Sequence, residues 1–76
     1  MKLYDILKQD YSDEIVVDIN FSYGHVTILD RANGESVFLQ GDEASEFLAD
    51  YKKLWDKSLP VRLIECHLAR PYLGNS

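Results

Sequence analysis

Apolar residues recur along the chain with two different periods. Near the start, Leu3, Ile6 and Leu7 follow helical spacing between polar neighbours, which predicts a short amphipathic helix over residues 2–9. From Ile15 the period becomes two and β-branched residues dominate, which is typical of a strand with one buried face. A helix followed by a strand is therefore predicted for this part of the chain.

Two turn signals divide the next stretch into further strands. Tyr23-Gly24 and Asn33-Gly34 each contain a glycine that tolerates positive φ, and we interpret each as a two-residue hairpin loop. Strands are then expected over residues 25–30 and 35–40. Loops of this length fix the register and place apolar residues opposite one another across the sheet. The expected opposing pairs are Phe21 with Val26, Ile19 with Ile28, and Ile28 with Leu39.

A second helical pattern follows the last predicted strand. Asp42 can cap a helix over residues 43–56, whose acidic first turn suits the positive end of the helix dipole. Its apolar residues form a continuous stripe, which we expect to cover the inner face of the sheet with Phe47 and Trp55 largely buried. The stripe consists of Ala44, Phe47, Leu48, Tyr51, Leu54 and Trp55.

A last helix is expected after residue 57. Ser58 can cap it, Pro60 fits its first turn, and Arg70-Pro71 should end it because proline disfavours the helical conformation at the preceding residue. Its expected apolar side consists of Val61, Ile64 and Leu68, with Ala69 on another side. The predicted fold is a single α+β domain over residues 1–76. It comprises a short N-terminal helix, a three-stranded antiparallel meander and two C-terminal helices packed on one face, in the order α-β-β-β-α-α.

Length and charge limit the functions that this domain can have. A chain of 76 residues builds one small core and leaves little room for a deep catalytic cleft. The formal net charge is −5, from 13 Asp and Glu against 8 Lys and Arg, and such a surface repels nucleic-acid phosphates and anionic lipids. We therefore expect a protein partner with a basic surface, and no direct binding to nucleic acid or membrane.

Catalytic, metal and cofactor chemistry have little support in the sequence. Cys66 and His67 are neighbours, but adjacent helical residues project about 100° apart and do not face one another. His25 and His67 lack the spacing of a metal site, the glycines form no phosphate-binding pattern, and no spacing selects a catalytic carboxylate pair. We therefore expect no enzymatic activity, metal or cofactor. The lone cysteine and the lack of an export signal predict a cytoplasmic location.

One candidate surface for partner binding is acidic. Glu43, Glu46 and Asp50 follow i, i+3, i+7 spacing and should align along one side of the predicted helix. This acidic ridge is either a solvated helix face or a docking surface for Lys and Arg of a partner.

The other candidate surface is the outer face of the predicted sheet. It carries Val16, Leu29 and Phe38, and the predicted register places Leu29 opposite both Asp18 and Phe38. Apolar side chains on a face that should be solvated indicate a contact surface. The alternative is that the first or the last helix covers them.

One segment is similar to a pattern in short phage and prophage proteins of unassigned function. Val37-Phe38-Leu39-Gln40-Gly41-Asp42-Glu43-Ala44, followed by Phe47-Leu48, resembles the corner at which their last strand passes through Gln-Gly-Asp into an amphipathic helix. The resemblance implies this corner and transfers no functional residue. Small acidic phage proteins often inhibit host machinery, so it also implies an inhibitor, with anti-CRISPR and anti-restriction proteins as examples.

The predicted function is thus non-catalytic protein binding by a phage-encoded inhibitor that occupies a host protein complex, such as a CRISPR or restriction system. A self-associating assembly or structural accessory protein is the alternative, and a small enzyme is a third possibility. Neither the target nor the oligomeric state follows from the sequence.

Overall fold

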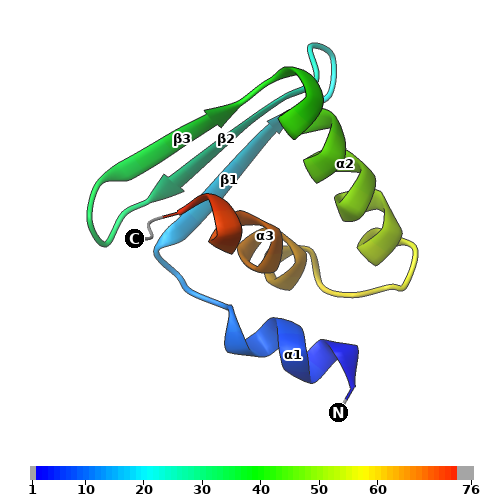
Figure 1. Cartoon of the computed structure of the whole chain (residues 1–76). Coiled ribbons are helices and arrows are strands. Elements are labelled where there is room, and N and C mark those ends of the chain that lie inside the picture. The colour runs from blue at the N-terminus through cyan, green and yellow to red at the C-terminus, as the bar shows by residue number, and fades with distance from the viewer. Residues whose placement is uncertain (1, 74–76) are drawn as a thin grey trace.

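The computed structural model describes residues 2–73 and has the predicted order of elements. Helix α1 (Leu3–Gln9) precedes an antiparallel meander of β1 (Ile15–Asn20), β2 (His25–Asp30) and β3 (Glu35–Leu39), in which β2 is central (Figure 1). Helices α2 (Gly41–Trp55) and α3 (Val61–Ala69) follow, and a short 3₁₀ helix, η1 (Arg70–Tyr72), extends α3. The α+β prediction is confirmed.

The two hairpin loops are longer than predicted. They comprise residues 21–24 and 31–34. Each ends in a glycine with positive φ, which is 68° at Gly24 and 75° at Gly34. The residues before the loops are Asn20 and Asp30, whose carbonyl oxygens accept hydrogen bonds from these glycine N–H groups at 2.9 and 2.8 Å. Their side-chain oxygens accept a further loop N–H at 3.2 and 3.0 Å. These side-chain to backbone bonds stabilise the four-residue loops, and a Gly signal alone does not reveal them.

The predicted register is consequently wrong by two residues in both hairpins. Ile28, expected opposite Ile19 and Leu39, pairs with Val17 and Val37 instead. A shift of two residues keeps every side chain on its predicted face, because the faces of a strand alternate with a period of two. Ile28 and Leu39 are accordingly buried, and Ile19 is partly buried against the same core.

The ends of the C-terminal helices agree only in part with the prediction. The N-cap of α2 is Gln40 rather than Asp42, and that of α3 is Pro60 rather than Ser58. Asp42 lies in the first turn of α2, where its charge still favours the positive end of the dipole. Helix α3 ends directly before Arg70-Pro71, as predicted.

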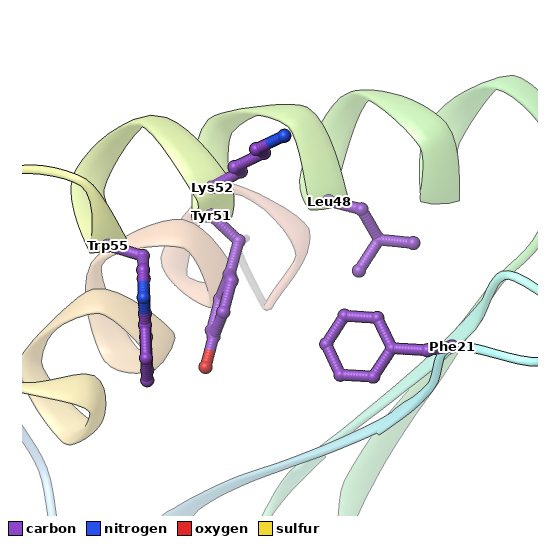
Figure 2. A pocket seen from close by; sticks show the side chains of 5 residues that line it. All are labelled: Phe21, Leu48, Tyr51, Lys52 and Trp55. Carbon is purple, nitrogen blue, oxygen red and sulfur yellow. The ribbon is translucent and has the colours of Figure 1, made fainter.

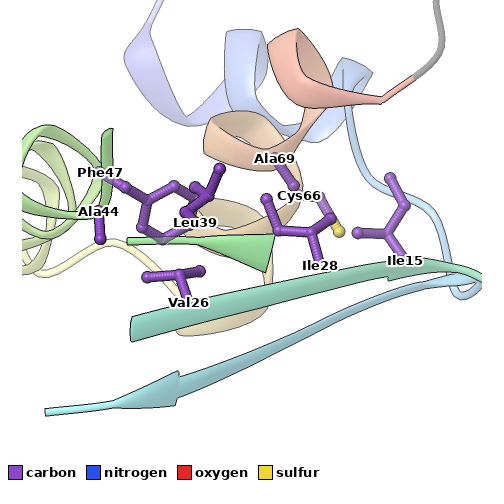
Figure 3. Close-up of a cluster of buried hydrophobic side chains, with 8 residues drawn as sticks. All are labelled: Ile15, Val26, Ile28, Leu39, Ala44, Phe47, Cys66 and Ala69. Atoms are coloured by element: carbon purple, nitrogen blue, oxygen red, sulfur yellow. The ribbon is translucent and has the colours of Figure 1, made fainter. Parts of the chain in front are cut away.

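The helices cover one face of the sheet, with α2 against β2 and α3 against β1 (Figure 1). The larger core cluster lies between the sheet and these two helices (Figure 3). Its fully buried members are Ile15, Val26, Ile28, Leu39, Ala44, Phe47, Cys66 and Ala69.

Helix α3 is buried on two sides, because it lies between β1 and α1. Toward the sheet it contributes Cys66 and Ala69, and toward α1 it contributes Leu63 and Ile64, which pack with Leu7. The expectation that Ala69 lies away from the apolar side is therefore wrong. A single apolar stripe cannot describe a helix with neighbours on both sides.

Polar contacts tie the end of α1 and the start of β1 to α3 and η1. The guanidinium of Arg62 donates to the carbonyl oxygen of Ile15 at 2.7 Å. The Nδ1 atom of His67 lies 2.7 Å from a carboxylate oxygen of Asp10, and Nε of Arg70 donates to the Asp10 carbonyl oxygen at 3.1 Å. Several of the basic residues of α3 and η1 thus hold the fold together.

Candidate functional site

The acidic ridge (Glu43, Glu46 and Asp50) lies along the flank of α2 that borders a hollow of about 290 Å³. Glu43 and Glu46 are exposed, and Asp50 is half-buried. The hollow is formed by α2, the end of α3 and η1, and its lining residues are Glu46, Phe47, Asp50, His67, Leu68, Pro71 and Tyr72. Two of the three ridge residues, Glu46 and Asp50, therefore belong to the wall of a partly apolar depression.

Tyr72 lies beside the acidic ridge and is affected by its charges. Burial raises the pKa of Tyr72 above its ordinary value of 10.0, and the negative charges of Glu46, Glu43 and Asp50 raise it further. The helix η1 positions this ring, which packs against Phe47 with 6.2 Å between ring centroids. All three ridge carboxylates thus lie close enough to Tyr72 to act on its hydroxyl electrostatically.

Replacing Glu43, Glu46 and Asp50 together by Gln, the triple-Gln variant, should lower the pKa of Tyr72. The pKa should stay above 10.0, because burial of the ring remains. A raised folded-state pKa gives stability that is present below pH 10.0 and is lost as the pH rises through the folded pKa, so this loss should be smaller in the variant. NMR titration of the Tyr72 ring measures the shift. An unchanged titration would contradict the electrostatic effect of the three carboxylates on the hydroxyl.

The helices formed by residues 2–73 all lie on one side of the sheet, so within this part of the chain its outer face is free of helices (Figure 1). Val16 is 38% exposed, Phe38 is 53% exposed and Leu29 is half-buried. Leu29 pairs with Val16 and Ser36, so its expected position opposite Asp18 and Phe38 is wrong. The three apolar residues nevertheless share this face, and the alternative that a terminal helix covers them is excluded for residues 2–73.

An aromatic stack on the same face was not foreseen from the sequence. The His25 ring stacks on Tyr23 at 5.9 Å and meets the edge of Phe38 at 5.0 Å. The sequence predicts His25 in the second strand without the spacing of a metal site, and Tyr23 in a turn. The sequence did contain a signal for this contact, because the alternation places His25 and Phe38 on the same face of the sheet. The stacked rings enlarge the apolar outer surface.

A second depression, the aromatic groove, lies on the other flank of α2 and was also missed. It measures about 490 Å³ and is lined by Phe21, Leu48, Tyr51, Lys52 and Trp55. Figure 2 shows Leu48, Tyr51 and Trp55 projecting from α2 toward a space that Phe21 closes from the end of β1. Phe21, expected opposite Val26 in the sheet, lies in the first hairpin loop and is 71% exposed.

The prediction that Trp55 is largely buried is wrong. Phe47 is 2% exposed, as expected, whereas Trp55 is 54% exposed. The apolar stripe of α2 is wider than the side that the sheet and α3 can cover, so Trp55 at the end of the helix turns to the flank. The signal in the sequence was a second i, i+3, i+4, i+7 pattern, formed by Leu48, Tyr51, Lys52 and Trp55.

The neighbouring Cys66 and His67 have separate surroundings. The Cys66 thiol is buried, and its Sγ atom lies 3.5 Å from the carbonyl oxygen of Ser12. His67 faces Asp10 instead. Within residues 2–73, no group of three or more His, Cys, Asp and Glu side chains is placed to hold a metal ion.

Comparison of the chain with protein-family models, curated proteins and solved structures finds no match. Within the part of the chain that the structure describes, no helix has both the length and the apolar character needed to cross a bilayer. A functional hypothesis for this domain therefore depends on its own surface, and on the two flanks of α2 in particular.

Proposed function

We propose that this protein is a non-catalytic binding domain that docks a basic partner protein through the acidic ridge. The observation that carries the proposal is the position of Glu46 and Asp50 on the wall of a hollow that Tyr72 also lines, with Glu43 close enough to raise the pKa of Tyr72 together with them. The alternative, a helix face that is only solvated, gives no reason for a hollow beside the charges. The ridge supplies negative charge, and the hollow supplies a place for a side chain.

The chemistry of the hollow suits Lys or Arg of a partner. Leu68 and Pro71 give it apolar walls against which a long aliphatic stem can pack, while the charged end reaches the carboxylates. The neutral ring of Tyr72 offers an aromatic surface for a guanidinium group. The net charge of −5 adds long-range attraction to a basic surface and repulsion from nucleic acid and anionic membranes.

Inhibition of a host complex is the form of binding that the resemblance to small phage proteins favours. In this form the domain acts in the host cytoplasm and blocks a basic surface of a host assembly, such as a CRISPR or restriction complex. No catalytic step, metal or cofactor is part of the proposal.

The triple-Gln variant tests the proposal. Affinity capture from host lysate provides the partner, and titration calorimetry then compares the wild-type domain with variants against the purified partner. Loss of three charged contacts at a ridge should weaken the complex by roughly ten- to a hundredfold, and wild-type affinity should fall as salt rises. The fold should remain, because exposed helix charges contribute little to stability.

A control with the same change in net charge separates local docking from long-range attraction. Asp5, Glu14 and Asp56 are exposed acidic residues outside the ridge, and their replacement by Asn, Gln and Asn keeps the ridge intact. This control should bind nearly as well as the wild type. Equal weakening of both variants, or full binding by the triple-Gln variant at every salt concentration, would contradict docking at the ridge.

Self-association through the outer sheet face is the second candidate function. Val16, Leu29 and Phe38 on a face free of helices, extended by the Tyr23 and His25 stack, favour it. Size-exclusion chromatography with light scattering distinguishes the two functions. A stable oligomer that is nearly insensitive to salt would favour assembly, and a monomer would favour the ridge.

A further inference from the structure

Three of the residues that line the aromatic groove carry a polar group that can donate a hydrogen bond. They are Tyr51 with its hydroxyl, which can also accept, Lys52 with its ammonium, and Trp55 with its indole N–H. Figure 2 shows the Lys52 side chain at the rim, directed away from the space between Phe21 and Tyr51. Lys52 carries the single charge among the lining residues, and this charge is positive in a chain whose net charge is −5. The groove is thus the electrostatic opposite of the acidic ridge on the other flank of α2.

Two of these donors are unused within residues 2–73. Neither an ion pair nor a hydrogen bond engages the ammonium of Lys52 or the indole N–H of Trp55 in this part of the chain. Burial, together with the nearby charge of Glu65, raises the pKa of Tyr51, which keeps its hydroxyl protonated. Glu65 itself is held by Arg62 at 2.9 Å.

The body of the groove is aromatic and open to a ligand. The rings of Tyr51 and Trp55 stack with 6.2 Å between centroids, and Phe21 and Leu48 lie across the space from them (Figure 2). Trp55 and Phe21 are 54% and 71% exposed, so covering them releases water from large apolar surfaces. The volume of about 490 Å³ lies in the range typical of small-molecule sites, which are mostly apolar with few polar groups.

We propose that the aromatic groove is a binding site for a small amphiphilic organic anion, with an aromatic or aliphatic body between Phe21 and Tyr51 and an acidic group that extends past the rim to Lys52. The charge of Lys52 selects an anion over a neutral or cationic ligand. The site is independent of the proposed function, because it uses the opposite flank of α2 and needs no partner protein.

Anilinonaphthalene sulfonate is a probe of this class, and phenylnaphthylamine is nearly the same molecule without the sulfonate. Trp55 is the single tryptophan of the chain, so energy transfer from tryptophan to the bound probe reports a position close to the groove. The sulfonate should bind one site per monomer with transfer from Trp55, and phenylnaphthylamine should bind more weakly. Trp55→Phe should remove the transfer while the probe still binds.

Two pairs of variants locate the probe. Phe21→Ala should weaken binding of the sulfonate about tenfold through loss of one apolar wall, whereas Tyr23→Ala, in the same loop and 76% exposed, should not. Lys52→Gln should weaken sulfonate binding roughly two- to fivefold without changing phenylnaphthylamine binding. Lys53→Gln, the adjacent lysine outside the groove, should change neither.

Other outcomes overturn the proposal. Equal affinity for the two probes, or equal effects of Lys52→Gln and Lys53→Gln, would mean an unselective apolar surface. Loss of binding in Tyr23→Ala with Phe21→Ala unaffected would place the probe on the outer sheet face. Trp55 emission that changes with protein concentration, together with a doubled mass by light scattering that Phe21→Ala abolishes, would show that a second copy fills the groove. An absence of probe binding would also refute the site.

Discussion

Phe47→Ala is expected to lower the free energy of unfolding by about 3–5 kcal/mol. Phe47 is 2% exposed and lies in the core cluster that joins α2 to the sheet and α3, with its ring against Tyr72 (Figure 3). Truncation removes the apolar contacts and leaves a cavity that the surrounding strands cannot fill. Urea denaturation followed by circular dichroism measures the loss, which should appear as a lower midpoint at an unchanged slope.

Trp55→Ala is the matched control on the same helix. Trp55 is larger than Phe47 but 54% exposed, so its removal should cost clearly less stability. A Phe47→Ala midpoint equal to that of the wild type would contradict the role of α2 as the cover of the core. A larger loss in Trp55→Ala than in Phe47→Ala would contradict the exposure of the aromatic groove.

Leu7→Ala should lower the free energy of unfolding by about 2–5 kcal/mol and release α1 from the domain. Leu7 is the one fully buried residue of α1, and it packs with Leu63 and Ile64 of α3. A helix of seven residues is not stable without such packing. Urea denaturation measures the total loss, and amide hydrogen exchange in α1 measures its local part.

Ile6→Ala serves as the control for this helix, since Ile6 is 40% exposed and Ala has high helix propensity. It should change the midpoint little. If Ile6→Ala and Leu7→Ala lowered stability equally, α1 would be rotated about its axis relative to the structure described here.

The fold was predictable because each element has its own periodic signal. The alternation from Ile15 onward and the helical stripe around Phe47 do not depend on loop details, so the order of elements and the buried faces follow from them. The register does depend on the loops, and the hydrogen bonds of Asn20 and Asp30 that favour four-residue loops are not visible in a glycine pattern. Face assignment remained correct because the error was an even number of residues.

The candidate surfaces were predictable where the periodicity of single elements places their residues on one face, as for Val16, Leu29 and Phe38 on the outer side of the sheet. Glu43, Glu46 and Asp50 lie on a single helix, so their spacing sufficed to place them together. The hollow beside them depends on Tyr72, which reaches the ridge through the packing of η1 and is far away along the chain. The aromatic groove likewise joins a loop residue, Phe21, to α2, and no local pattern predicts such a contact.

NMR titration of the isotope-labelled domain with the purified basic partner tests the proposed interface most directly. If the partner docks at the acidic ridge, the backbone amides of residues 43–50 and the ring of Tyr72 should show the largest chemical-shift changes, and added salt should reverse these changes. Shifts concentrated at Val16, Leu29 and Phe38, with residues 43–50 unaffected, would contradict docking at the ridge and move the interface to the outer face of the sheet.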